Sequence, residues 1–167
     1  MRANDKRLMT TDEHDTPNQF RLRELTYRYE IKRDLQGRPI PLGGLATCGQ
    51  EAWTTVRRFL QDEAVEVFGV LCLTTKYRVI CWHELSRGTL DSSLAHPREL
   101  FKAAIMANSA AVIVAHNHPS GDPTPSPDDI ALTRRLAAAG ELLGIPVIDH
   151  IVVGDDCFTS LRQRGSL

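Results

Sequence analysis

The sequence contains no apolar stretch near the ~18 residues that a membrane-spanning helix needs, and its N-terminus lacks the apolar core of a signal peptide. It also lacks an excess of charge of one sign. The formal net charge is −1, so nothing attracts the whole chain to nucleic acid or to an anionic membrane. These absences argue against a membrane partner and against direct binding of nucleic acid, and they predict a cytoplasmic protein.

The four cysteines do not form a C-x-x-C pair; they are Cys48, Cys72, Cys81 and Cys157. Their spacing therefore gives no indication of a cysteine zinc site or of a thioredoxin-like motif. In a cytoplasmic protein we expect these thiols to be reduced and mostly buried.

The chain does have an ordinary globular composition: its 167 residues are 42% hydrophobic and 25% charged, which suits one domain with a proper core. Residues 1–19 are polar and predict a disordered tail. Residues 20–45 contain an alternating stretch, Glu24–Lys32, typical of a half-buried strand, and then a loop rich in glycine and proline. The main domain is expected over residues 46–167.

Helical and strand patterns alternate within this main domain. Gln50–Gln61 has an amphipathic helical pattern, and Val65–Leu73 is apolar on both faces, which indicates a central strand. Further helices are predicted over Arg98–Ala107 and Pro127–Leu143, and further strands over Arg78–His83, Pro146–Val153 and Cys157–Leu161. The apolar face of the last helix is expected to run through Ile130, Leu132, Leu136 and Leu143. This alternation predicts an α/β fold with a mixed sheet flanked by helices.

A hairpin is expected near residue 76. If Lys76-Tyr77 is a two-residue turn, Cys72 lies opposite Cys81, and residues 66 and 84 fall on opposite faces of the sheet. The two thiols would then be close enough to bond. A reduced pair is favoured, and a disulfide is left open.

Two histidines follow a short β-branched run at Ala110–Ala115, which reads as a buried strand. His116 and His118 are one residue apart, so on extended chain their imidazoles point to the same side. Ser126 before a proline is a strong helix start, and it places Asp129 in the first turn. Two imidazoles and a carboxylate form a ligand set that suits one Zn²⁺ ion with an open position for water.

Each part of this pattern also has an ordinary structural explanation. A lone histidine at a strand end is often a satisfied polar side chain. Ser126 with Asp129 is also a plain capping arrangement at a helix N-terminus. The combination is far more specific than its parts: H-x-H, seven residues, Ser, two residues, Asp. We therefore predict that His116, His118 and Asp129 are metal ligands.

This spacing matches the JAMM motif of the JAB/MPN metalloprotease family. Two segments resemble the RadC branch of that family: AHNHPSGDPTPS and LLGIPVIDHIVVG. The similarity covers about residues 45–167 and is weak upstream. The resemblance implies the JAB/MPN fold, which is cytidine-deaminase-like in architecture. Full-length RadC members carry a helix-hairpin-helix region before this domain, and the chain is similar to short forms that lack it.

Zinc held by these ligands would lower the pKa of a bound water toward ~7. Amide hydrolysis also needs a base and a donor to the oxyanion. Glu66 and Glu84 are the candidate bases, and Glu66 is favoured because it is similar to the position where the family places its catalytic glutamate. Ser126 occupies the place of the family's serine, which supports the water and the oxyanion.

The first functional hypothesis is therefore a zinc-dependent metalloprotease or isopeptidase acting on a peptide or protein substrate. The alternative is a catalytically silent RadC-like accessory or binding module in DNA repair or DNA metabolism. A zinc deaminase ranks last, because such enzymes use H-x-E with a later P-C-x-x-C, and neither is present. The oligomeric state is left open.

Overall fold

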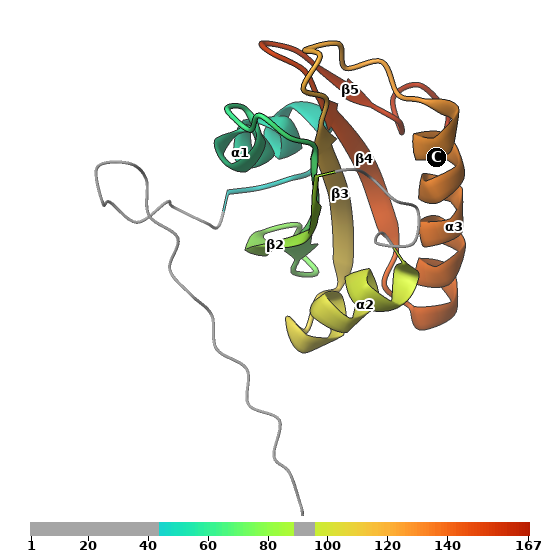
Figure 1. Cartoon of the computed structure of the whole chain (residues 1–167). Coiled ribbons are helices and arrows are strands. Elements are labelled where there is room, and N and C mark those ends of the chain that lie inside the picture. Colours follow the sequence, from blue (N-terminus) through green and yellow to red (C-terminus); the bar gives the residue numbers. More distant parts are fainter. Residues whose placement is uncertain (1–43, 89–95) are drawn as a thin grey trace, which may run out of the picture. The chain divides into compact units, whose positions relative to one another are not determined.

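The computed structural model describes residues 44–88 and 96–167, and a five-stranded mixed sheet lies at their centre (Figure 1). The strands are β1 (Val67–Leu73), β2 (Val79–Arg87), β3 (Ala111–Asn117), β4 (Val147–Val153) and β5 (Phe158–Ser160). Their order is β2-β1-β3-β4-β5, with β3 and β4 parallel and every other neighbouring pair antiparallel. The predicted mixed sheet is confirmed.

Helices cover both faces of this sheet (Figure 1). Helix α1 (Gly49–Leu60) packs on one face, while α2 (Pro97–Met106) and α3 (Pro127–Leu143) pack on the other. Each face therefore has its own apolar core. On the α1 side Val56 packs with Leu71 and Ile113. On the α2 and α3 side Phe101 packs with Val112.

Strands β1 and β3 lie in the middle of the sheet, and every residue of both is buried. Their near-continuous apolar sequences suit this position, because each residue faces one of the two cores. Full burial of a leucine or isoleucine such as Leu71 or Ile113 contributes about 1.5–3 kcal/mol each. The two central strands are thus fully buried, and one of them, β3, carries His116 and leads directly to His118.

The hairpin between β1 and β2 differs from the prediction in its turn. Its loop has three residues, 75–77, because Tyr77 N donates to Thr74 O and Thr74 N donates to Arg78 O, both at 2.9 Å. Tyr77 takes a positive φ of 56°, the left-handed conformation that ends such loops. The predicted two-residue turn is wrong.

The predicted pairing of Cys72 with Cys81 is nevertheless confirmed. An irregularity after Cys72 adds one residue to β2, and this offsets the longer loop. Of the four cysteines, all are free thiols and only Cys72 is buried, so the expectation that most are buried is wrong. Strand β2 also runs four residues beyond the predicted end at His83, so Glu84 lies inside it.

Helix α3 has the predicted bounds, which its end residues explain. Ser126 caps the N-terminus, and Gly144 ends the helix with a positive φ of 69°. The buried face, however, runs through Asp129, Thr133, Leu136 and Gly140. Of the apolar residues expected on this face, Leu136 is fully buried as predicted, whereas Leu143 is 49% exposed, so the prediction is wrong there. The helix meets the sheet largely through small and polar residues.

The predicted tail at 1–19 and the predicted strand Glu24–Lys32 lie outside the described residues. Of the predicted loop, the described part begins at Gly44, and Leu45 forms a β-bridge with Arg78. Among the described residues, no helix combines the length and apolarity that crossing a membrane would require.

Candidate metal centre

The two histidines of the H-x-H pair meet at the carboxyl end of β3. His116 is the penultimate residue of the strand and is fully buried, and His118 follows the strand's last residue. Their Nε2 atoms lie 3.0 Å apart. The extended backbone thus places both rings on the α3 side of the sheet, as the spacing predicts.

His118 is held in one ring orientation by the loop that follows it. Its Nδ1 lies 2.7 Å from the backbone oxygen of Asp122. A carbonyl can only accept, so Nδ1 carries the hydrogen and, in the neutral ring, Nε2 presents its lone pair to the centre. The loop is fixed in turn, because His118 N donates to Val153 O at 2.9 Å.

Asp129 divides its two carboxylate oxygens between the helix and the centre. Oδ2 accepts from the backbone N and from the hydroxyl of Ser126, both at 2.7 Å, which forms a capping box with Asp129 N donating back to the serine. Oδ1 lies 3.4 Å from Nε2 of His116. One oxygen is therefore committed to the cap, and the other is available to a metal.

Burial by itself would raise the pKa of Asp129. When His116 is protonated, its hydrogen bond and charge, together with the hydrogen bonds from Ser126, outweigh that effect and hold the pKa of Asp129 well below its ordinary value. The carboxylate is thus ionised at neutral pH, which is the form that binds a cation.

Glu66 reaches the same place from the residue that precedes β1. Its Oε1 lies 3.9 Å from Nε2 of His116. Burial raises the pKa of Glu66, only partly opposed by the charges of His116 and His118. Of the two candidate bases, Glu66 is thus at the centre, whereas Glu84 is exposed and pairs with Arg87 at 2.9 Å.

Asn117, between the two histidines, points to the segment that carries Glu66. Its Oδ1 accepts from Val67 N at 2.8 Å, and its Nδ2 donates to Val65 O at 3.0 Å and to Glu63 O at 3.3 Å. The side chain is buried, so these bonds are shielded from water. Asn117 therefore ties the backbone on both sides of Glu66 to the tip of β3.

Glu66, His116, His118 and Asp129 together offer four ligand atoms that all lie within 4.8 Å of one another. Around a tetrahedral ion with bonds of about 2.0–2.1 Å, ligand atoms stand about 3.3 Å apart. The Nε2 atoms of the two histidines approach this spacing at 3.0 Å, and so does Asp129 Oδ1, which lies 3.4 Å from His116 Nε2. His118 Nε2 lies 3.6 Å from the other carboxylate oxygen of Asp129, Oδ2. Carboxylate oxygens and an imidazole lone pair face one point, so the donor set fits a cation.

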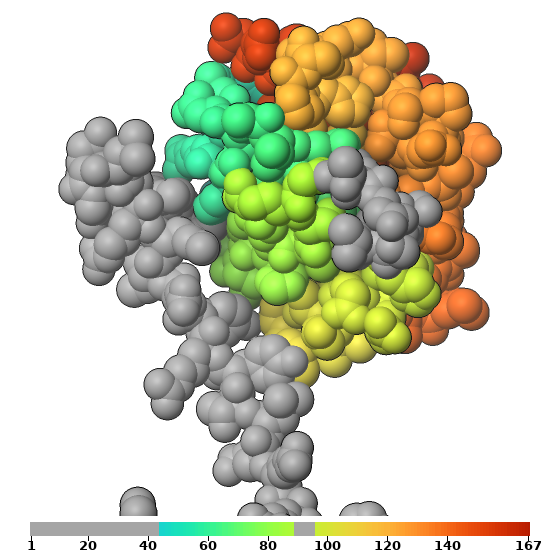
Figure 2. Space-filling view, viewed as in Figure 1, coloured from blue at the N-terminus to red at the C-terminus, as the bar shows by residue number. Residues whose placement is uncertain are grey.

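The centre is open on one side. The side chains of His116 and Asp129 are 0% and 6% exposed, whereas those of His118 and Glu66 are 18% and 24% exposed. Figure 2 shows the orange surface of the residues after β3 next to the green surface of the segment before β1. A bound cation would be enclosed from the sheet side and reachable from the side of Glu66 and His118.

Ser126, the predicted catalytic serine, bonds to Asp129 and is not one of the four clustered ligand residues. Its single hydroxyl hydrogen is donated to Asp129 Oδ2, and its oxygen accepts from Asp129 N at 3.1 Å. The capping explanation of this serine is therefore confirmed as a structural fact. A role at an oxyanion stays a prediction.

Sequence reasoning did not assign roles to three residues around the centre: Asn117, Thr133 and His150. His150 Nε2 lies 2.8 Å from Nδ1 of His116. Burial lowers the pKa of His150 well below its ordinary value. No local pattern could identify these partners, because the bonds of Asn117 and the bonds that join His150 to Thr133 and to His116 link residues on different elements.

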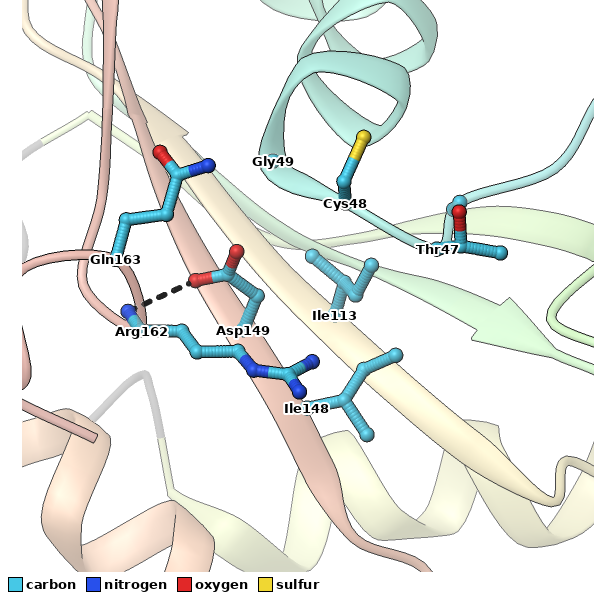
Figure 3. Close-up of a pocket in the computed structure, with 9 residues that line it drawn as sticks. Thr47, Cys48, Gly49, Ile113, Ile148, Asp149, Arg162 and Gln163 are labelled. Carbon is cyan, nitrogen blue, oxygen red and sulfur yellow. Dashed lines mark hydrogen bonds between the residues drawn. The ribbon is translucent and has the colours of Figure 1, made fainter.

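A separate cavity of about 260 Å³ lies on the α1 side of the sheet (Figure 3). It contains the carboxylate of Asp149, which neighbours His150 in β4 but faces the opposite way. Burial raises the pKa of Asp149. Its oxygens accept from Ser160 Oγ and from the backbone N of His150 and Arg162, so this carboxylate ties β4 to the chain's end.

The fold and the group formed by Glu66, His116, His118 and Asp129 define an α/β domain with a candidate metal centre at the carboxyl end of its central strand β3. The chain belongs to the RadC-like JAB domain family, whose model matches residues 46–166. The mixed sheet and three helices agree with the JAB/MPN fold that the sequence resemblance implies.

Similar curated proteins are named only as UPF0758 proteins. One from Desulforamulus reducens is 48% identical over 136 residues, which cover 81% of this chain and 60% of that protein. One from Shouchella clausii is 44% identical over 142 residues, which cover 85% of this chain and 62% of that protein. The chain thus spans less than two thirds of the length of these relatives.

Proposed function

We propose that this chain is a zinc-dependent metalloprotease or isopeptidase that hydrolyses an amide bond in a peptide or protein substrate. The observation that carries the proposal is the convergence of two imidazoles, one ionised carboxylate and one offset glutamate on a single open point. Two histidines, one carboxylate and a vacant fourth position are the donor set of catalytic zinc.

In this proposal His116 and His118 hold the ion through Nε2, and Asp129 holds it through Oδ1. When bound, zinc would lower the pKa of a coordinated water to about 7 and polarise the scissile carbonyl. The buried sides of His116 and Asp129 fix the position of the ion. The exposed sides of His118 and Glu66 admit water and substrate.

Glu66 is proposed as the base. Its Oε1 lies 3.9 Å from His116 Nε2, compared with 3.4 Å for Asp129 Oδ1, and its side chain is on the exposed side of the centre, where water can reach it. Its raised pKa brings it closer to the value at which a carboxylate can both take and return a proton near neutrality. Glu66 would take a proton from the attacking water and pass it to the departing amine nitrogen.

The main role proposed for Ser126 is to orient Asp129, and contact with the oxyanion is a second role. Its hydroxyl hydrogen points to Asp129 Oδ2, so contact with a developing oxyanion requires the hydroxyl to rotate away from that oxygen. A donor that reaches the oxyanion is worth roughly 3 kcal/mol in such reactions.

The test compares Glu66→Gln with Glu84→Gln, a matched change at the other candidate base. Zinc-loaded wild type and both variants are incubated with a peptide library, and newly formed N-termini are identified by mass spectrometry. We expect cleavage by wild type and Glu84→Gln. Glu66→Gln should keep its zinc and lose at least about 100-fold in rate, the lower range of general-base effects.

Zinc retention separates the two roles that Glu66 could have. A ligand would lose zinc affinity on substitution, whereas a base would not. The proposal is contradicted if zinc-loaded wild type cleaves nothing in the library, or if Glu66→Gln cleaves as fast as wild type.

A further inference from the structure

A chain of three buried hydrogen bonds leads from the backbone of α3 to the ring of His116. Thr133 Oγ1 lies 2.6 Å from the backbone oxygen of Asp129 and 2.5 Å from Nδ1 of His150. His150 Nε2 lies 2.8 Å from Nδ1 of His116. The side chains of Thr133, His150 and His116 are all fully buried, so water does not compete for these bonds.

The direction of each bond follows from its first acceptor. A backbone carbonyl can only accept, so Thr133 donates its single hydroxyl hydrogen to Asp129 O. The hydroxyl oxygen must then accept from Nδ1 of His150. His150 is fully buried, and among the described residues its ring hydrogen-bonds to a hydroxyl and an imidazole but to no carboxylate, so its ring is neutral and its Nε2 is an acceptor.

The last bond then has only one direction: Nδ1 of His116 donates to Nε2 of His150. With its hydrogen on Nδ1, His116 has a free lone pair on Nε2. This is the atom that lies 3.0 Å from Nε2 of His118 and 3.4 Å from Asp129 Oδ1.

We propose that Thr133 and His150 are positioning residues that set the tautomer of His116 and so keep its Nε2 lone pair aimed at the metal. The inference deepens the proposed function and rests on it for the identity of the ion. Both residues are fully buried, so neither lies on the exposed side of the metal centre, where Glu66 and His118 are.

These hydrogen bonds also couple helix α3 to both ligands. Thr133 lies one turn after Asp129 on α3, so the same helix carries one ligand and sets the tautomer of another. The ring of Phe68 packs edge-on against His150, with centroids 5.8 Å apart and an interplanar angle of 86°. This contact limits the rotation of His150 and keeps its Nε2 directed at His116.

His118 provides an internal control, because its Nδ1 hydrogen is fixed by the backbone oxygen of Asp122 and not by this chain. A change at Thr133 should therefore alter the tautomer of His116 and leave the tautomer of His118 unchanged. Thr133→Val removes the hydroxyl at nearly constant shape, and Thr133→Ser retains it.

The experiment is nitrogen NMR of the histidine rings in metal-free protein at mildly alkaline pH, followed by zinc competition against a chelator. In wild type and Thr133→Ser we expect His116 to be protonated on Nδ1 only. In Thr133→Val we expect a mixture of tautomers at His116, a His118 that keeps its hydrogen on Nδ1, and zinc binding weakened on the order of 10–100-fold.

A wild-type His116 protonated on Nε2 would overturn the proposal, and this readout does not depend on whether a variant folds. An unchanged single tautomer in folded Thr133→Val would also overturn it. Because no substrate is involved, an inactive protein with the expected tautomer contradicts only the hydrolase proposal. An active protein with the opposite tautomer contradicts only this inference.

Discussion

A single side chain, Asp129, takes part both in the helix cap and in the candidate metal centre. Its Oδ2 belongs to the capping box with Ser126, and its Oδ1 is the oxygen left for a cation. The cap fixes the carboxylate in one rotamer, so the ligand is in place before any metal arrives. The structural and functional explanations of this pair are thus complementary.

Substitution of Ser126 tests how much the cap that it forms with Asp129 stabilises the fold. Ser126→Ala removes the cap on Asp129 N and a donor to Asp129 Oδ2, so we expect a loss of about 1 kcal/mol in the free energy of unfolding. Urea unfolding of metal-free protein measures it, with Ser126→Thr as the control that retains a hydroxyl. An alanine variant as stable as wild type would show that the cap contributes nothing.

The sequence was informative about residues whose geometry is local. The alternation of extended chain predicted that His116 and His118 converge, and the Ser-Pro start predicted where Asp129 would lie. His150 and Thr133 could not be assigned in the same way. Their positions depend on how β4 and α3 pack against β3, which no local pattern encodes.

Asn117 connects two elements, since it joins the tip of β3 to the chain leading into β1. It satisfies Val67 N, which would otherwise be a buried donor without a partner. It also holds the carbonyls of residues 63 and 65. The position of Glu66 thus depends on a side chain that is not itself in the cluster.

We expect Asn117→Ala to lower the free energy of unfolding by about 1–3 kcal/mol, the cost of leaving Val67 N unsatisfied. Peptide hydrolysis should fall more than zinc affinity, because Glu66 loses its support and the ligands do not. Urea unfolding, zinc competition and cleavage rate are measured on the same preparation. Equal losses in zinc affinity and in rate would contradict this role.

Element boundaries show where sequence patterns succeed and where packing overrides them. Helix α3 was predicted to the residue because Ser126, Pro127 and Gly144 mark its ends chemically. Its buried face was predicted only in part: Leu136 is buried as expected, but apolar periodicity gave no weight to Asp129 and Thr133, polar residues that are buried with their hydrogen bonds satisfied. The hairpin turn was mispredicted because Tyr77 adopts a left-handed conformation in place of the usual glycine or asparagine.

At the scale of the whole domain, the centre exists only when distant segments meet. Residues 63–67, the tip of β3, the start of α3 and the middle of β4 all contribute to it. The unfolded chain has no such arrangement, so a metal that binds here stabilises the folded state. At a free metal concentration 100 times Kd that stabilisation is about 2.7 kcal/mol.

The zinc content of the purified chain is the most direct test of whether His116, His118 and Asp129 bind a zinc ion. Wild type, His118→Ala and the matched control His83→Ala, an exposed histidine on β2, are dialysed against zinc and then against metal-free buffer. Folding is checked by circular dichroism, and zinc is measured by plasma mass spectrometry. We expect one zinc ion per chain in wild type and His83→Ala and a large loss in His118→Ala. A folded wild type without zinc, or a His118→Ala variant that retains as much zinc as wild type, would contradict it.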